Sequence, residues 1–190
     1  MWASHNQHRK TKPNVILIMT DDQGYGDCSC TGNPWLATPS IDAFVDSGVR
    51  LENFHVSPLC SPTRAALLTG RHCRSVGVRG CNSDENLLST DALTIANVMS
   101  ENGYATGIFG KWHLGDNYPF RPIDRGFQEA VVHCNGAVTT VPDHWANSYF
   151  NDVYLHNGAK QRYEGYCTDV WFREALRFIS ESQDQPFFCY

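Results

Sequence analysis

Two residues that could do chemistry, Cys60 and Arg64, lie close together in the segment SPLCSPTRAALLTG, residues 57–70. Pro62 has a position typical of the first turn of a helix, and Ser61 is expected to cap that helix. Cys60 is then expected just ahead of the helix N-terminus, where unpaired N–H groups and the helix dipole favour a negative charge. Arg64, one turn further on, can approach the side chain at position 60. The spacing therefore indicates a site for an anion, either a Cys60 thiolate or an oxyanion made from that residue.

Two other interpretations of this segment have to be weighed. An isolated cysteine is usually a buried structural residue, and Arg64 would then form a surface ion pair. A phosphatase of the cysteine type also places a thiolate and an arginine at a helix N-terminus, but its loop needs five residues between them to wrap a phosphate. Here only three residues separate Cys60 from Arg64, and Pro62 has no N–H to offer. The spacing excludes such a loop.

A pair of acids, Asp21 and Asp22, follows the apolar run VILIM. In open α/β sheets, ligands gather beyond the carboxyl ends of strands, which is where this pair is expected. Adjacent carboxylates repel each other, and their oxygens suit Ca²⁺ or Mg²⁺ rather than zinc. The alternative is that Asp21 caps a turn leading to Gly24 and Gly26 while Asp22 faces solvent.

The chain has eight cysteines but no C-x-x-C pair, which argues against a structural zinc site. His72, Cys73 and Cys81 are considered as half of such a site. The chain is too large and too apolar to need disulfides as a scaffold, so the cysteine count leaves the redox compartment open.

The elements that must position these residues alternate between apolar and amphipathic segments. Strands are predicted over residues 13–22 (fully buried), 104–110 and 185–190, with a loop over 111–115 and a hairpin over 152–165 that turns at Asn157 and Gly158. Helices are predicted over residues 38–48, 61–70, 89–103 and 168–180, with Thr38, Ser61 and Thr168 as caps of the first, second and fourth. This order predicts an α/β fold with a predominantly parallel sheet flanked by helices.

Length and charge narrow the class of protein. With 190 residues and 42% hydrophobic content, one compact core is expected. The net charge is −5 and the basic residues are scattered, so no nucleic-acid partner is expected. The longest apolar run is too short to span a bilayer, and the first dozen residues lack a secretory signal. The sequence stops within an apolar strand, which favours the front part of a longer protein over an edge strand at a true C-terminus.

Three motifs in this order resemble those of the type I sulfatases, which belong to the alkaline phosphatase superfamily. CSPTRAALLTGR matches the C-x-P-x-R signature with its downstream L-T-G-R, PNVILIMTDDQGYGD resembles the opening strand and acid pair, and GYATGIFGKWHLG resembles the second signature. RGFQEAVVHCNG and PFFCY resemble family segments more loosely. We therefore expect residues 1–12 to be a polar tail and residues 13–190 to be the N-terminal part of a truncated alkaline-phosphatase-like sulfatase domain.

The resemblance implies an arylsulfatase-like sulfuric ester hydrolase. In such sulfatases a separate maturation enzyme recognises C-x-P-x-R and oxidises the cysteine, here Cys60, to Cα-formylglycine. The aldehyde hydrates to a diol, one hydroxyl attacks the sulfur of a sulfate ester, and the alcohol leaves. The second hydroxyl then expels sulfate and regenerates the aldehyde. The implied partners are this maturation enzyme and a sulfated small molecule or sugar.

By the same resemblance, Asp21, Asp22 and the modified Cys60 would be ligands of Ca²⁺, with Mg²⁺ as the alternative. Two carboxylates and one diol provide fewer than the six to eight oxygens or so that Ca²⁺ prefers. An Asp-Asn pair, a second sulfate-binding lysine and a histidine that protonates the leaving alcohol are expected beyond the chain end.

The resemblance also implies catalytic roles for residues of the two signatures. Arg64 would hold and polarise the formylglycine hydroxyl, and Lys111 would bridge residue 60 and a sulfate oxygen, which makes it a substrate-binding residue. His113 would bond the non-attacking hydroxyl and help take its proton. The alternative for Lys111 and His113 is a surface loop packed by Trp112. His133 falls where some relatives place a substrate-contacting residue and is left unassigned.

Two alternatives to a sulfatase are kept open. A phosphonate or phosphate ester hydrolase of the same superfamily can also carry C-x-P-x-R, and nothing in the sequence decides between the substrates. An inactive fragment that lacks the rest of the site is the other. The compartment also stays open, because relatives are commonly exported and no export signal is visible.

Overall fold

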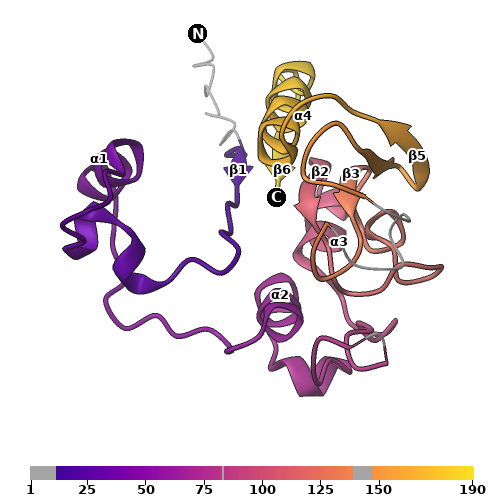
Figure 1. Ribbon diagram of the computed structural model, residues 1–190. Helices are drawn as coiled ribbons and strands as arrows, with labels where there is room; N and C mark the ends of the chain where they lie inside the picture. Colours follow the sequence, from indigo (N-terminus) through magenta and orange to yellow (C-terminus); the bar gives the residue numbers. More distant parts are fainter. Residues whose placement is uncertain (1–11, 83, 139–146) are drawn as a thin grey trace, which may run out of the picture. The chain divides into compact units, whose positions relative to one another are not determined.

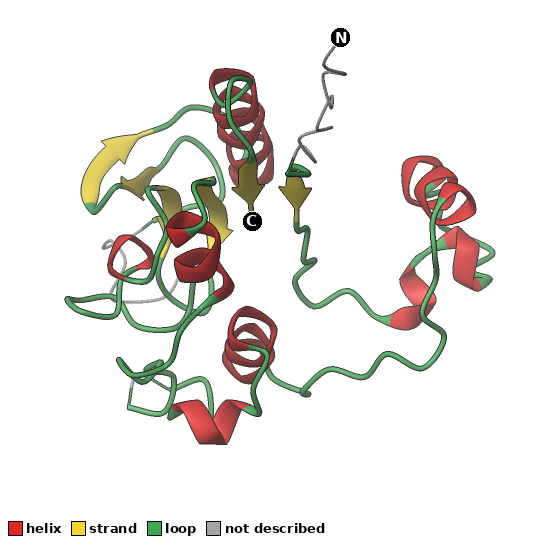
Figure 2. Ribbon diagram, turned by 180° about the vertical axis from the view of Figure 1, so that it is seen from behind, coloured by secondary structure: helices red, strands yellow, loops and turns green. Residues whose placement is uncertain are grey.

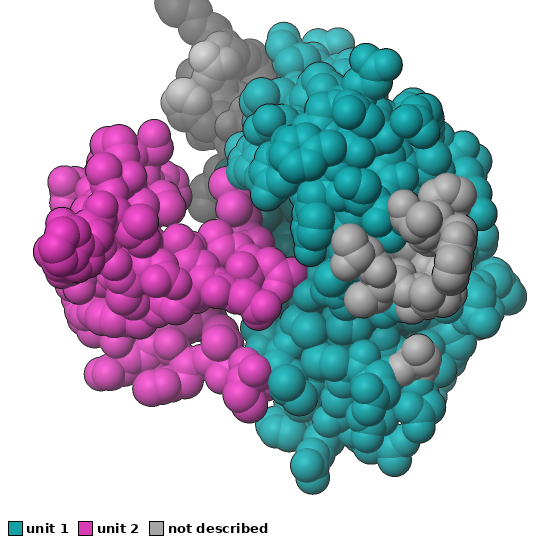
Figure 3. All heavy atoms as spheres, in the orientation of Figure 1, with its two compact units in different colours: residues 1–17, 59–190 teal, residues 18–58 magenta. Residues whose placement is uncertain are grey.

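The computed structural model describes residues 12–82, 84–138 and 147–190 of the chain. The chain divides into two compact units, which Figure 3 shows in different colours: unit 1 comprises Met1–Leu17 and Leu59–Tyr190, and unit 2 comprises Ile18–Pro58. All but the last residue of the expected polar tail 1–12 lies outside the described residues.

The α-helices and strands of unit 1 follow one another in the predicted order, with β3 (Glu129–His133) as an additional strand that was not predicted (Figures 1 and 2). Among its described elements, unit 2 contains helices only. The strands are β1 (Val15–Ile16), β2 (Ala105–Lys111), β3 (Glu129–His133), β4 (Val153–His156), β5 (Ala159–Arg162) and β6 (Phe187–Cys189). The α-helices are α1 (Pro39–Ser47), α2 (Cys60–Thr69), α3 (Ile95–Glu101) and α4 (Cys167–Glu181). Short 3-10 helices are η1 (Tyr25–Asp27), η2 (Ser29–Thr31), η3 (Cys73–Val76) and η4 (Pro122–Asp124).

Unit 1 is built on a six-stranded sheet in the order β1-β6-β2-β3-β4-β5. The four strands from β1 to β3 are parallel, and β4 and β5 add an antiparallel hairpin that turns at Asn157 and Gly158, both with positive φ. The prediction of a mostly parallel α/β sheet and of this hairpin is confirmed. The strand β6 lies between β1 and β2, so it is an interior strand of the sheet rather than an edge strand.

Alternating side chains of the strands pack against helices on the two faces of the sheet. Phe178 of α4 joins Ala105 and Phe187 in one cluster. On the other face, Ala65 of α2 and Ala96 of α3 join a larger core that includes Ile108 and Phe188. Because Phe187 and Phe188 are neighbours that face opposite ways, the period of two along the strand distributes the apolar side chains between two layers.

Unit 2 is held mainly by polar contacts. Asp42 of α1 accepts hydrogen bonds from the hydroxyls of Ser29 (2.6 Å) and Thr38 (2.9 Å) and from the backbone N–H of Cys30 (3.0 Å). The bond from Ser29, followed by those from Thr38 and Cys30, lowers the pKa of the Asp42 carboxyl. No side chain of α1 is buried, and Phe44 is 78% exposed. The helix bounds are as predicted, but its apolar side chains do not form a buried face.

Several predicted details are wrong at the ends of elements. Ser61 does not cap α2, which begins at Cys60 with Leu59 as its N-cap, and α4 begins at Cys167, ahead of Thr168. The third helix begins only at Ile95, because the hydroxyl of Thr94 accepts the N–H of Asn97 and caps it there.

The predicted buried strand over residues 13–22 is reduced to the two residues of β1. Ile16 and Ile18 are 55% and 68% exposed. Within the described residues β1 pairs with β6 alone, so the expectation of a fully buried strand is wrong.

Within the described ranges, no helix combines the length and the hydropathy that a bilayer-spanning segment needs.

Candidate active site

The first turn of α2 positions Cys60 and Arg64. The N–H of Thr63 bonds the carbonyl of Leu59 (3.1 Å), so Cys60 is already helical rather than just ahead of the helix. Ala65 and Leu68 of the same helix are buried in the larger core, which fixes the helix in unit 1. The first-turn placement still leaves Cys60 near the N-terminal N–H groups that favour a negative charge.

Arg64 is buried, and its guanidinium is held by two groups. Its Nη1 donates to the carbonyl of Lys111 (2.7 Å) and to the hydroxyl of Tyr190 (3.2 Å). These bonds connect α2 to the end of β2 and to the residue after β6. The alternative that Arg64 forms a surface ion pair is wrong, because only 4% of the residue is exposed.

The end of β2 positions Lys111 and His113. Lys111 is the last residue of the strand, and the N–H of His113 continues the pairing by bonding the carbonyl of Cys134 (3.0 Å). Trp112 between them is fully buried, and its indole N–H bonds the carbonyl of Phe120 (2.9 Å). The alternative of a surface loop packed by Trp112 is right about the tryptophan, which packs this segment. It is wrong about His113, which is buried rather than exposed in a loop.

His113 adopts a backbone conformation that is uncommon for a residue with a side chain. Its φ is 59°, in the left-handed region. Its ring lies close to the backbone of Gly136, where a Cβ would come within 3.1 Å of the ring carbon Cε1. Strained residues of this kind cluster at functional sites.

Three side chains converge at this point: Cys60, Cys81 and His113. The Cys60 sulfur lies 3.2 Å from Nδ1 of His113 and 3.3 Å from the Cys81 sulfur. Nε2 of His113 lies 3.1 Å from the carbonyl oxygen of Cys81. Since a carbonyl can only accept, Nε2 carries the proton and donates it, and Nδ1 presents its lone pair to the side chain at position 60.

Burial keeps this histidine neutral and the thiol protonated. The pKa of His113 is lowered to about 4, first by burial and then by the charge of Lys111. Burial and the neighbouring Cys81 raise the pKa of the Cys60 thiol, and the charge of Lys111 opposes this rise. At neutral pH the Cys60 thiol therefore donates its proton toward Nδ1 of His113, without transferring it.

Asp21 and Asp22 lie in unit 2, and both are exposed. Asp22 has a φ of 53°. The turn that follows is closed by Asp27, which accepts the N–H of Gly24 (2.7 Å). Among the predicted site residues, the structure brings together Cys60 and His113 directly, and it connects Arg64 to the backbone of Lys111.

Two residues of this site, Cys81 and Tyr190, were not predicted from the sequence. Cys81 contacts both Cys60 and His113, yet it had been grouped with His72 and Cys73. Cys73 packs in the core, and the ring of His72 accepts the N–H of Arg74. That zinc half-site is wrong: within the described ranges, the group of three or more side chains that could hold a metal ion is Cys60, Cys81 and His113.

Tyr190 is the other missed residue, since its hydroxyl accepts a hydrogen bond from Arg64. A spacing of 21 residues between Cys60 and Cys81, and of 126 between Arg64 and Tyr190, carries no local signal that could have found either contact.

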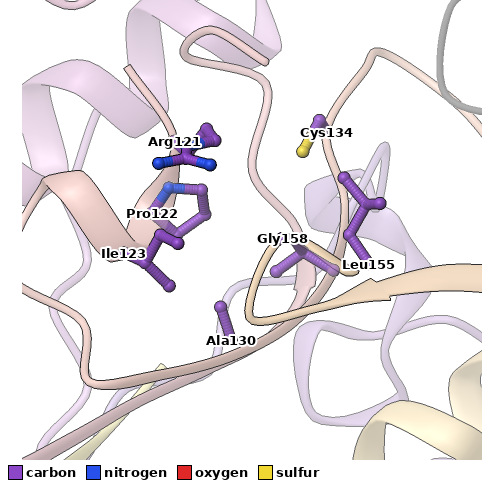
Figure 4. A pocket seen from close by; sticks show the side chains of 8 residues that line it. Arg121, Pro122, Ile123, Ala130, Cys134, Leu155 and Gly158 are labelled. Carbon is purple, nitrogen blue, oxygen red and sulfur yellow. The ribbon is translucent and has the colours of Figure 1, made fainter. Parts of the chain in front are cut away.

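Two other features of unit 1 do not add to the site. His133 at the end of β3 is buried and stacks on Trp171, with ring centroids 6.0 Å apart, and it stays unassigned. A small apolar pocket shares no residue with the converging group (Figure 4). Its lining residues are Arg121, Pro122, Ile123, Ala130, Val132, Cys134, Leu155 and Gly158.

A protein-family model described as Sulfatase matches residues 13–190. The chain is 43% identical over 131 residues to human Arylsulfatase D, an alignment that covers 61% of this chain and 22% of that protein. It is 33% identical over 211 residues to human N-acetylgalactosamine-6-sulfatase, with 94% of this chain and 38% of that protein covered. The chain thus spans less than two fifths of the length of these relatives.

Solved structures show the same fold over nearly the whole chain. Ps i-CgsB in complex with k-i-k-neocarrahexaose has a TM-score of 0.82 and 34% identity, covering 95% of this chain and 44% of that one. BT4656, solved with its substrate D-glucosamine-2-N,6-O-disulfate, has a TM-score of 0.77 and 26% identity, covering 94% of this chain and 33% of that one. The fold of the described residues is therefore that of part of a larger domain.

Proposed function

Because the chain belongs to the sulfatase family, we propose that the full-length protein carrying it hydrolyses sulfate monoesters with a nucleophile made from Cys60. The observation that carries the proposal is the position of Cys60, in the first turn of α2 and 3.2 Å from a neutral His113 ring nitrogen. A nucleophile placed beside a base that is itself oriented by a third group is the general arrangement of covalent hydrolases.

The residue at position 60 would act as formylglycine, made by a maturation enzyme that recognises C-x-P-x-R. Once hydrated, this residue supplies a geminal diol as the nucleophile. The thiol of Cys60 now faces Nδ1 of His113 and the N-terminus of α2. A hydroxyl in the same place would donate to the same nitrogen, so the pocket suits the modified residue as well as the thiol.

Nδ1 of His113 would accept a hydrogen bond from the non-attacking hydroxyl and would then help to take the proton of that hydroxyl. The carbonyl of Cys81 fixes the tautomer by accepting the Nε2 proton, which keeps Nδ1 unprotonated. Arg64 would stabilise negative charge on residue 60, and its bonds to the Lys111 carbonyl and the Tyr190 hydroxyl fix its orientation. The Lys111 side chain would bind a sulfate oxygen, consistent with its positive charge acting on both Cys60 and His113.

Asp21 and Asp22 would hold a divalent cation, Ca²⁺ or Mg²⁺. Their exposed carboxylates provide the oxygen donors that hard cations prefer, so the residues fit the ion. When bound, the cation would supply positive charge that neutralises a sulfate group. Two carboxylates leave most of the coordination shell of such a cation to further oxygen ligands.

The proposed substrate class is a sulfated sugar or another small sulfate ester. A solved relative was captured with D-glucosamine-2-N,6-O-disulfate as its substrate, and curated relatives include N-acetylgalactosamine-6-sulfatase. These names support a sugar sulfate but do not choose among sugars, since the part of the relatives that this chain matches is less than half of each.

The test compares two substrates on the full-length protein after co-expression with the maturation enzyme. An aryl sulfate should be hydrolysed with a higher kcat/KM than the matching aryl phosphate, because the site is proposed to match a monoanionic ester. A preference for the phosphate would assign the protein to the phosphate or phosphonate hydrolases of the superfamily. Hydrolysis of neither ester by a folded, matured protein would favour the inactive alternative.

A further inference from the structure

Two side chains contact the sulfur of Cys60, those of Cys81 and His113, and the proposed hydrolysis gives no role to the sulfur of Cys81. Cys81 is on the loop after η3, and its sulfur lies 3.3 Å from that of Cys60. His113 contributes Nδ1 at 3.2 Å from the Cys60 sulfur. The three possible ligand atoms lie within 4.8 Å of one another. Two sulfurs and one imidazole nitrogen make a donor set for a soft or borderline cation, whereas Ca²⁺ prefers oxygen.

We infer that, while Cys60 is still an unmodified thiol, Cys60, Cys81 and His113 form a binding site for a thiophilic cation of the Zn²⁺ type. Zinc bonds of about 2.3 Å to sulfur and about 2.0 Å to nitrogen place neighbouring ligand atoms of a tetrahedron about 3.5–3.8 Å apart. The observed separations of 3.2 and 3.3 Å need to widen by only a few tenths of an ångström. Solvent would supply the fourth ligand.

The orientation of His113 supports a ligand role for its Nδ1. Metal-binding histidines usually donate their other ring N–H to a carbonyl or carboxylate, which fixes the tautomer and aims the lone pair at the metal. Here the Cys81 carbonyl accepts from Nε2 at 3.1 Å. Cys81 therefore provides one ligand through its sulfur and orients a second ligand, His113, through its carbonyl.

The charge balance of the site also allows the ion. Two cationic side chains lie along the same elements, because Arg64 is one turn after Cys60 in α2 and Lys111 is two residues before His113. Two thiolates and a neutral imidazole around a divalent cation give a complex with no net charge. The thiols of Cys60 and Cys81 would lose their protons to solvent when the metal binds, as metal-binding thiols do. The complex then adds no positive charge beside the two cationic side chains.

The proposed metal site distinguishes two chemical states of residue 60, the thiol and formylglycine. The thiol of Cys60 can bind the metal, but formylglycine at the same position has no sulfur to offer. The metal would therefore bind only the unmodified form of the folded protein. The thiol site does not depend on the proposed sulfatase activity, since it requires only the unmodified side chains.

The test uses full-length protein expressed without the maturation enzyme, reduced, and checked by mass spectrometry for an intact Cys60 thiol. Co²⁺, which reports its ligands by absorption, should bind one ion per chain with a thiolate-to-cobalt charge-transfer band that Zn²⁺ abolishes. Cys81→Ser should weaken binding by at least about tenfold, because it removes a ligand. Cys28→Ser, the same exchange at a partly buried cysteine of unit 2, should bind like the wild type.

A second measurement covers the case in which Cys81→Ser disturbs folding. Zn²⁺ should slow alkylation of Cys60 in the wild type by at least about tenfold, read on the tryptic peptide that contains it. The wild type without a charge-transfer band, Cys81→Ser with unchanged affinity, or Cys60 alkylated equally fast with and without Zn²⁺ would each overturn the inference. Loss of aryl sulfatase activity in the matured protein would instead count against the proposed function and leave the thiol site standing.

Discussion

The two units hold the predicted site residues in very different ways. In unit 1, Arg64 and His113 are buried, and each bonds a backbone carbonyl, that of Lys111 for Arg64 and that of Cys81 for His113. In unit 2, the carboxylates of Asp21 and Asp22 are exposed, and helix α1 of the same unit has no buried side chain. The surroundings of Cys60 are therefore fixed by the core of the sheet, whereas the proposed metal-binding acids gain little order from the packing of their own unit.

The largest expected effect concerns the nucleophile. In the matured full-length protein, Cys60→Ala should reduce aryl sulfate hydrolysis to the uncatalysed background, because alanine cannot be converted to an aldehyde hydrate. Cys28→Ser in unit 2 should retain wild-type kcat/KM. Substantial turnover by Cys60→Ala, measured with initial rates on an aryl sulfate, would show that unit 1 does not supply the nucleophile.

The next largest expected effect is the loss of activity when Asp21 or Asp22 is replaced. Asp21→Asn and Asp22→Asn should each lower kcat/KM by at least roughly a hundredfold, since each removes a charged oxygen ligand of the cation. A chelator should inactivate the wild type, and added Ca²⁺ should restore it. Asp46→Asn, at an exposed acid of the same unit, is the control and should change little. If both acid variants kept wild-type activity and the wild type resisted chelation, the acid pair would have no role in hydrolysis.

Stability should distinguish the units as well. Leu68→Ala in α2 should lower the free energy of unfolding by about 2–5 kcal/mol, because the buried side chain leaves a cavity in the core. Phe44→Ala in α1 should change it by less than about 0.5 kcal/mol, since Phe44 is largely exposed. Urea denaturation followed by circular dichroism measures both. Equal losses for the two variants would contradict the contrast drawn between the units.

The smallest effect is a pH dependence of stability due to His113. Its folded-state pKa of about 4 lies below the ordinary value of 6.5, so between these values the unfolded chain takes up a proton that the folded protein does not. Stability should therefore fall as pH drops from about 6.5 to 4, by up to about 3 kcal/mol from this group.

His113→Asn should lack this contribution. The measurement is the difference in free energy of unfolding between wild type and variant at several pH values. A difference that stays constant with pH would mean that burial does not hold the imidazole neutral.

The sequence was sufficient for features that depend on local chemistry. Pro39 and Gly48 bound α1 as predicted, and Asn157 with Gly158 turns the hairpin through two residues of positive φ. The two signature segments supplied Cys60 and His113, which the structure brings into contact. The order of apolar and amphipathic segments also predicted the mostly parallel sheet.

Features that depend on long-range pairing could not be predicted from sequence. The apolar run of residues 15–19 predicts a fully buried strand. The burial of a strand depends on its neighbours in the sheet, and β1 pairs with β6 at the end of the described strand order, where Ile16 is exposed. Cys81 reaches Cys60 because the loop after η3 turns at Gly77, with φ of 89°, and the N–H of Val78 bonds the carbonyl of Cys73. A single glycine in the sequence gives no sign of where such a loop will end.

The most direct test of the account is the chemical state of residue 60 in the mature protein. The full-length protein is co-expressed with the maturation enzyme, digested with trypsin, and the peptide containing position 60 is analysed by mass spectrometry. The account predicts the mass of an aldehyde at this position and reaction of the peptide with a hydrazide probe. A peptide that carries only the cysteine thiol, from protein that is folded and was exposed to the enzyme, would contradict it.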